Sequence, residues 1–137
     1  MKFSVVARVF EQIDQTTART TMTGLLADLL RGATADEAKK ICYLALGVLH
    51  PVHRGTQFAI AQKSMVKIIA QLLNETESMV QREGERSGDL GSVLGIYDWK
   101  NARDLTVTEL YDALLELENI EGTGSQELKS TALQKLL

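Results

Sequence analysis

The spacing of apolar residues is the feature that most constrains the fold of this chain, because it is helical along almost the whole length. The first apolar stripe consists of Phe3, Val6, Phe10 and Ile13. Residues at this spacing lie on one face of an α-helix, whereas a half-buried strand alternates every second residue. The single proline and the aromatic content of 5% also argue against a β-sandwich or barrel. The sequence predicts an all-α fold, a compact multi-helix domain of roughly seven to eight helices.

Start and end signals divide this pattern into separate helices. Two capping boxes, T-x-x-E at 34–37 and again at 106–109, predict helix starts. The helix after the first box must end before Pro51, and Gly122 is expected to be the C′ residue of the helix after the second. The apolar stripes cover residues 3–13, 22–30, 41–48, 65–73, 79–80, 107–117 and 128–136, with a short helical turn between Gly88 and Gly95.

The stripe at 41–48 is apolar nearly all the way round, so we expect its helix to be the central and most buried one. It contains the only cysteine, Cys42, which we expect to be a small buried hydrophobe. A single cysteine provides no disulfide framework.

The bulk composition indicates one soluble domain, residues 1–137. Hydrophobic residues make up 45% of the chain and charged residues 24%, which is typical of globular proteins. The first residues do not resemble a signal peptide, because Arg8 interrupts their apolar run. The longest apolar run, 41–49, is too short to span a bilayer. We expect a cytoplasmic protein with no membrane association.

The residues that usually perform catalysis or bind metals are sparse. His50 and His53 flank Pro51 and Val52, and the sequence has no third histidine, so we expect surface side chains rather than metal ligands. The paired carboxylates, such as Glu116 with Glu118, are better explained as solvated helix faces. We therefore expect no catalytic residue and no metal site.

The stretch EGTGSQELK, residues 121–129, lies between two predicted helices and combines glycines, hydroxyl residues and a lysine. A nucleotide-binding P-loop needs G-x-x-x-x-G-K-[ST] after a strand. Here a helix precedes the stretch, and no glycine stands before Lys129. The stretch is therefore interpreted as a turn followed by a new helix with Ser125 as its N-cap.

Two basic residues are expected near helix starts: Lys129, and Arg19, which follows threonines that could cap the second helix. A cation there opposes the helix macrodipole, but free N–H groups, hydroxyls and a cation together suit a phosphate oxygen. The alternative is that each basic side chain points into solvent without a role. The net charge of -3 does not itself suggest nucleic-acid binding, for which a basic domain is usual.

Several segments occur in an order and at separations similar to those of one known family. They are F-x-x-I-x-x-T-T-x-R at 10–19, L-A-L-G-V-L-H-P and G-T-Q-F-A-I-A within 44–61, K-S-M-V-K-I-I-A at 63–70, G-D-L-G at 88–91, L-T-V-T-E-L-Y at 105–111 and G-T-G-S-Q-E-L-K-S-T-A-L-Q-K-L-L at 122–137. Together they make the chain resemble the N-terminal DNA-binding domain of ATP-dependent DNA ligases of the archaeal and eukaryotic type.

The resemblance implies an all-helical domain that clasps nicked duplex DNA from the minor-groove side, independently of base sequence. It implies that Arg19 contacts a phosphate and that Thr16 and Thr17 support the turn that carries Arg19. We therefore expect Thr17 and Arg19 to be DNA-binding residues. The family pattern places four further residues at a helix start that faces the DNA backbone: Gly124, Ser125, Gln126 and Lys129.

In the resembled family, strand joining belongs to an adenylation domain with a K-x-D-G lysine, which uses ATP and a divalent metal such as Mg²⁺, and to an OB-fold domain. This sequence contains no K-x-D-G, so we expect no cofactor on it. The family domain continues beyond the equivalent of Leu137, and the last helix here has no stop signal, so we expect a fragment of a longer ligase that acts in replication, repair or recombination. In some archaeal members of the resembled family, the loop before L-T-V carries a glutamine and two aromatic residues that bind the sliding clamp. Here the loop is IYDWKNARD, 96–104, which has Tyr97 and Trp99 but lacks the glutamine pattern, so a sliding-clamp partner is possible but not supported by the loop sequence.

A second hypothesis remains open at this point. The acidic net charge and the amphipathic helices would also fit a helical protein–protein interaction module without a nucleic-acid role. An exposed apolar groove would favour that alternative.

Overall fold

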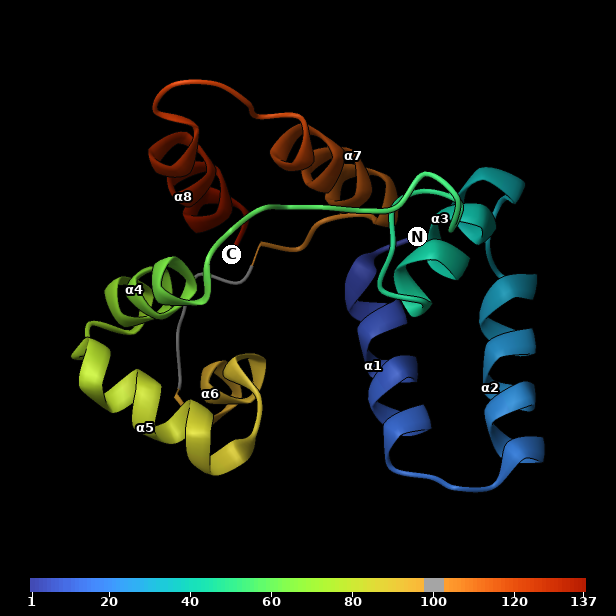
Figure 1. Cartoon of the computed structure of the whole chain (residues 1–137). Helices are drawn as coiled ribbons and strands as arrows, with labels where there is room; N and C mark the ends of the chain where they lie inside the picture. The colour runs from blue at the N-terminus through green and yellow to red at the C-terminus, as the bar shows by residue number, and fades with distance from the viewer. Residues whose placement is uncertain (98–102) are drawn as a thin grey trace. The chain divides into compact units, whose positions relative to one another are not determined.

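The computed structural model describes residues 1–97 and 103–137, and in these residues all regular structure is helical (Figure 1). The predicted all-α fold is confirmed, with eight helices in the described residues. They are α1 (Phe3–Asp14), α2 (Arg19–Arg31), α3 (Ala35–Ala45), α4 (Gln62–Leu73), α5 (Glu77–Ser87), α6 (Leu90–Ile96), α7 (Val107–Glu118) and α8 (Ser125–Leu136).

The helices form two compact units. The first comprises Met1–Gln57 and Asp104–Glu118, with α1 beside α2 and with α7 packed on both α1 and α3 (Figure 1). Its core is a cluster of four buried side chains from α1, α2, α3 and α7: Val6, Leu29, Ile41 and Val107. Partly buried Phe3 and Phe10 of α1 pack against this cluster on either side of Val6, which explains the three-to-four-residue apolar spacing.

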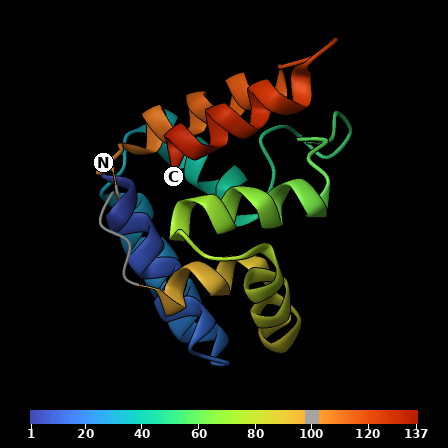
Figure 2. The ribbon, with the colours of Figure 1, turned by 90° about the vertical axis from the view of Figure 1, so that its left-hand side faces the viewer.

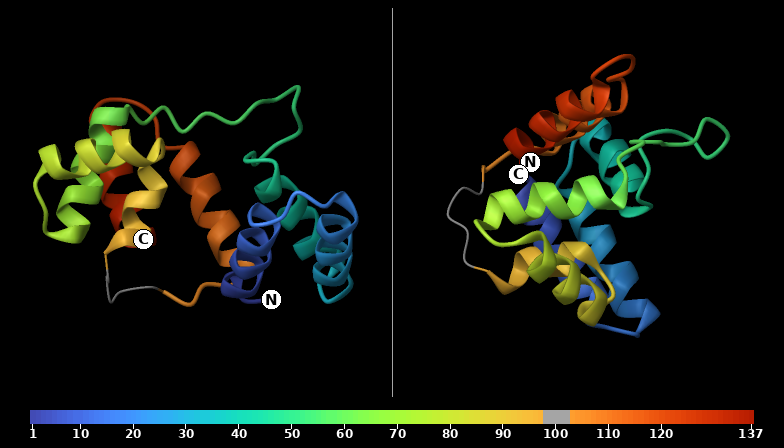
Figure 3. Two further views of the ribbon diagram at one scale, coloured as in Figure 1. Left: turned by 90° about the horizontal axis from the view of Figure 1, so that it is seen from below. Right: turned by 60° about the vertical axis from the view of Figure 1, so that its left-hand side comes forward.

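The second unit comprises Phe58–Arg103 and Asn119–Leu137. Helix α4 packs against α5, α6 and α8, and α5 packs against α6 (Figures 2 and 3). Its core cluster is drawn from α4, α5 and α6: Val66, Ile69, Ala70, Val80 and Val93. Helix α4 is therefore the organising element of this unit.

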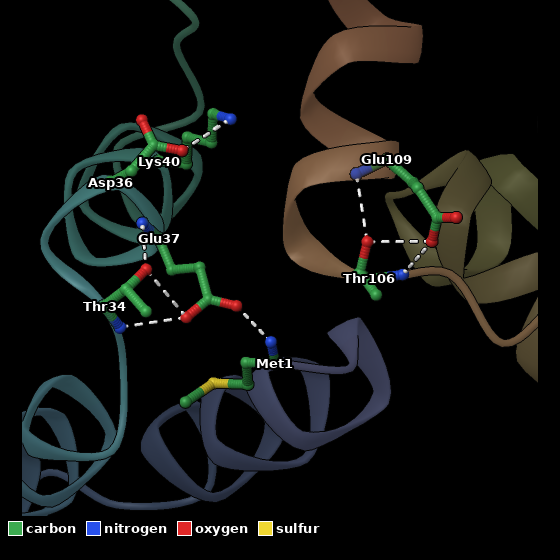
Figure 4. Close-up of polar contacts among 7 residues, drawn as sticks. All are labelled: Met1, Thr34, Asp36, Glu37, Lys40, Thr106 and Glu109. Atoms are coloured by element: carbon green, nitrogen blue, oxygen red, sulfur yellow. Dashed lines mark hydrogen bonds and ion pairs between the residues drawn. The ribbon is translucent and has the colours of Figure 1, made fainter.

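Both predicted capping boxes are present (Figure 4). The Glu37 N–H donates to Thr34 Oγ1 at 3.3 Å, and the Thr34 N–H donates back to Glu37 Oε2 at 2.9 Å. Thr106 and Glu109 repeat the arrangement: the Glu109 N–H donates to Thr106 Oγ1 at 3.2 Å, and the Thr106 N–H donates back to Glu109 Oε2 at 2.8 Å. Each box satisfies two N–H groups that would otherwise lack acceptors at the start of α3 or α7.

The Glu37 carboxylate has an additional partner, because the α-ammonium of Met1 donates a hydrogen bond to Glu37 Oε1 (Figure 4). This bond, together with the hydrogen bond from the Thr34 backbone, holds the pKa of Glu37 at about 2, against an ordinary value of 4.5. The same side chain therefore caps α3 and fixes the N-terminal segment to it.

The prediction that the helix around 41–48 is the most buried one was wrong. Helix α3 ends at Ala45, and the chain turns away at Gly47, where φ is +67°. Within α3 only Ile41 is buried, and Cys42 is exposed. The physical reason is that α3 packs mainly on α7, so residues off that face remain in solvent. Helix α4, with four buried residues, is more enclosed.

No helix within residues 1–97 or 103–137 has both the length and the apolar character needed to cross a membrane. The expectation about clamp binding rests on the loop 96–104, of which residues 98–102 lie outside the described part of the chain.

Candidate nucleic-acid interface

The turn before α8 is built on two glycines with positive φ, 93° at Gly122 and 78° at Gly124. A Cβ at either position would meet no atom within 4 Å, so glycine is favoured there by the left-handed backbone and not by lack of space. Since α7 ends at Glu118, Gly122 lies too far along the chain to be its C′ residue, and that prediction was wrong.

Ser125 is the first residue of α8 and Gly124 is its N-cap, so the expected Ser125 cap was also wrong. The backbone explains the difference, because the left-handed Gly124 turns the chain directly into the helix. A glycine has no side chain to accept a hydrogen bond, and the start of α8 has no side-chain cap. The Ser125 N–H donates to the Gly122 carbonyl at 3.2 Å, which leaves the N–H groups of Gln126 and Glu127 as the candidates for an external acceptor.

Gln126 and Lys129, two polar residues near the start of α8, donate hydrogen bonds to the chain's own backbone. Gln126 Nε2 donates to the Ala59 carbonyl at 2.9 Å, and Lys129 Nζ donates to the Phe58 carbonyl at 2.7 Å. Lys129 is 5% exposed and is the one buried charged residue in the described part of the chain. Its ammonium does not point into solvent, as the simpler alternative had supposed.

The segment that these two side chains hold is itself unusual. Ala59 has a φ of +49°, in the left-handed region, which costs an L-residue about 1 kcal/mol. Two residues later, Ala61 is the N-cap of α4. Gln126 and Lys129 thus fix the approach to α4 from α8.

In the first unit, Arg19 is the first residue of α2 and is exposed. The N-cap is Ala18, without a side-chain cap, so the prediction that a threonine caps α2 was wrong. Thr16 Oγ1 accepts a hydrogen bond from the Ala18 N–H at 3.2 Å. Because Ala18 is the N-cap, this bond precedes α2 and does not cap an N–H group of the helix. Thr17 is exposed beside it.

The predicted DNA-binding residues therefore form two groups. Thr17 and Arg19 lie together at the start of α2, in the first unit. Gly124, Ser125, Gln126 and Lys129 lie together at the start of α8, in the second unit. Their contact with DNA stays a prediction.

Sequence reasoning missed a polar cluster around Glu118, which was expected on a solvated helix face. Its Oε1 accepts a hydrogen bond from the Gln57 N–H at 2.8 Å, and its Oε2 lies 2.6 Å from His50 Nε2. Burial opposes ionisation of Glu118, but the hydrogen bonds from Gln57 and His50 outweigh it and lower the pKa of this carboxyl. His50 and Glu118 are 68 residues apart, and no local pattern marks such a pair.

No group of three or more histidine, cysteine, aspartate or glutamate side chains in residues 1–97 and 103–137 is arranged to hold a metal ion. The clusters described above are hydrogen-bonded to the chain's own backbone, so their visible role is to position loops and helix starts.

The chain matches the family described as "DNA ligase N terminus" over residues 2–137. It is 32% identical to a probable DNA ligase of Dictyoglomus turgidum over 137 residues, covering 100% of this chain and 24% of the relative. It is 31% identical to a DNA ligase of Cenarchaeum symbiosum (100% of this chain, 24% of the relative) and 30% identical to that of Pyrobaculum neutrophilum (99% and 25%).

The chain spans about a quarter of the length of these curated relatives. The match covers both units, including the two helix starts that carry the predicted DNA-binding residues. The chain therefore belongs to the DNA ligase N-terminus family.

Proposed function

We propose that this chain is the N-terminal part of an ATP-dependent DNA ligase and that it grips nicked duplex DNA through the sugar–phosphate backbone. The observation that carries the proposal is the family match over residues 2–137. The grip would hold the nick while the rest of the enzyme seals it in replication, repair or recombination, in the cytoplasm.

The two helix starts support a backbone grip in physical terms. Neither α2 nor α8 has a side-chain cap, and neither Ala18 nor Gly124 can supply one. A phosphate at such a terminus accepts hydrogen bonds from free N–H groups and gains typically about 0.3–1 kcal/mol from the helix dipole. Because phosphates carry no sequence information, the binding would not depend on base sequence.

The joining chemistry would lie outside this chain. The sequence has no K-x-D-G lysine to accept AMP. Because the lysine that accepts AMP in the resembled family has no counterpart in this sequence, the ATP and Mg²⁺ sites would lie in the remainder of a longer protein.

The test is the affinity of the chain for nicked duplex DNA at two salt concentrations, with Arg19→Ala compared with Arg8→Ala. Both arginines are exposed and lack an ion-pair partner in the described residues, but Arg8 lies within α1 and not at a helix start. We expect Arg19→Ala to weaken binding and to reduce the salt slope by about 0.9, the value for one lost phosphate contact. If Arg19→Ala and Arg8→Ala change the affinity and the salt slope equally, Arg19 is not a specific phosphate contact.

A second candidate function, a protein–protein interaction module, is favoured by one observation in the first unit. A groove of about 310 Å³ is lined mainly by apolar side chains of α1, α2 and α3, including Phe10, Leu26 and Leu44. Such a groove suits the apolar face of a partner helix. If the chain fails to bind nicked duplex DNA even at low salt, this candidate replaces the first.

A further inference from the structure

Helices α4 and α8, which pack against each other in the second unit (Figure 2), border a groove of about 410 Å³. Eight of its nine lining residues are polar or charged, the exception being Ile68. An apolar helix would leave these polar groups without partners. The groove therefore suits a polar ligand, unlike the apolar groove of the first unit.

Lys67 is the only cation that lines this groove. It is exposed, at the middle of α4, and its ammonium has no hydrogen-bond or ion-pair partner among the described residues. Lys129, by contrast, is buried and already donates to the Phe58 carbonyl. Of these two lysines, only Lys67 can reach an external anion without first breaking an internal contact.

The other lining groups are hydrogen-bonding side chains that can adapt to a ligand. The Ser130 and Thr131 hydroxyls donate to carbonyls one turn earlier in α8, at 2.9 and 3.0 Å, and a hydroxyl can rotate to a new acceptor. Gln71 and Gln134 pair across the groove and retain further amide donors. Glutamine, serine, threonine and lysine side chains are typical contacts of phosphate and sugar oxygens.

We propose that the α4–α8 groove binds the sugar–phosphate backbone of duplex DNA, with Lys67 as its cation, and that Lys129 is a positioning residue that holds the segment before α4. This inference rests on the proposed function, and it moves the phosphate-contacting role in the second unit from Lys129 to Lys67. Glu127 is the one carboxylate that lines the groove, so it would oppose the ligand.

The experiment measures the affinity of the chain for nicked duplex DNA as a function of salt, with Lys67→Gln compared with Lys63→Gln. Lys63 is a matched control, because it lies one turn earlier on α4, is exposed and does not line this groove. We expect Lys67→Gln to weaken binding several-fold and to reduce the salt slope by about 0.9, whereas Lys63→Gln leaves the slope unchanged. Lys67→Arg, which keeps a cation at this position, should bind nicked duplex DNA about as well as the parent chain does. Glu127→Gln should bind it more tightly.

The outcomes separate the groove from the proposed function. If the parent chain binds DNA but Lys67→Gln and Lys63→Gln behave alike, the groove assignment is overturned and the proposed function stands. If the parent chain binds no DNA, both are overturned. Circular dichroism of each variant confirms folding, which these substitutions of exposed side chains should not disturb.

Discussion

Lys129 Nζ lies 2.7 Å from the carbonyl oxygen of Phe58, 71 residues earlier in the chain. This bond joins the first turns of α8 to the segment that leads into α4. A lysine that the sequence alone suggested as a phosphate contact therefore has an internal partner, and its removal should be seen first in stability.

Lys129→Met should lower the free energy of unfolding by about 1–3 kcal/mol, because it leaves the Phe58 carbonyl without its donor. Methionine keeps much of the buried length of the side chain, so the loss reports the hydrogen bond more than the packing. Urea unfolding measures the effect. If stability is unchanged while the salt slope of DNA binding falls by about one contact, Lys129 is a phosphate ligand after all.

The capping boxes could be predicted from sequence because each involves residues three positions apart. The contacts of Lys129 with Phe58 and of Glu118 with His50 span 71 and 68 residues. Only the packing of complete helices brings such residues together, so no local pattern predicts them. The prediction that Ser125 is the N-cap was wrong for a different reason. Serine is a preferred N-cap residue, but the left-handed conformation of Gly124 makes that glycine the N-cap, so that α8 begins one residue earlier than expected.

Glu37 should make stability depend on pH in acid. Its pKa in the folded chain is about 2 and the ordinary value is 4.5, so the unfolded state binds a proton first as the pH falls. The stabilisation from ionised Glu37 is complete above about pH 4.5 and is lost as the pH falls towards 2.

Glu37→Gln tests this assignment, because the amide keeps the size of the side chain but does not titrate. The difference in unfolding free energy between parent and variant should shrink between pH 4.5 and 2. Asp28→Asn is a suitable control, since Asp28 is an exposed carboxylate paired only with its helical neighbour Arg31. A difference that stays constant with pH would show that the Met1 ammonium does not stabilise ionised Glu37.

Glu118→Ala should destabilise the first unit by about 1 kcal/mol or more, because Gln57 and His50 both lose their partner. Glu116→Ala is the matched control, since Glu116 is exposed on the same helix. Thermal unfolding of the two variants makes the comparison. If both substitutions change the stability equally, the contacts of Glu118 with Gln57 and His50 contribute no more to stability than the exposed carboxylate of Glu116 does.

Two glycine-to-alanine substitutions should change the free energy of unfolding in opposite directions. Gly24 lies inside α2 with open space at its Cβ position, so Gly24→Ala should stabilise by about 0.5–1 kcal/mol. Gly124 has the same open space but a φ of +78°, so Gly124→Ala should destabilise by about 1 kcal/mol or more. Chemical unfolding of both variants checks the prediction, and a stabilising Gly124→Ala would mean that the turn before α8 does not need its left-handed residue.

The central claim is that this chain binds duplex DNA through its backbone. The most direct measurement is the dissociation constant of the chain with a nicked duplex over a range of salt concentrations. We predict that the logarithm of the affinity falls linearly with the logarithm of the salt concentration, with a similar slope for duplexes of unrelated sequence. Absence of binding at low salt, or binding that salt does not weaken, would contradict the claim.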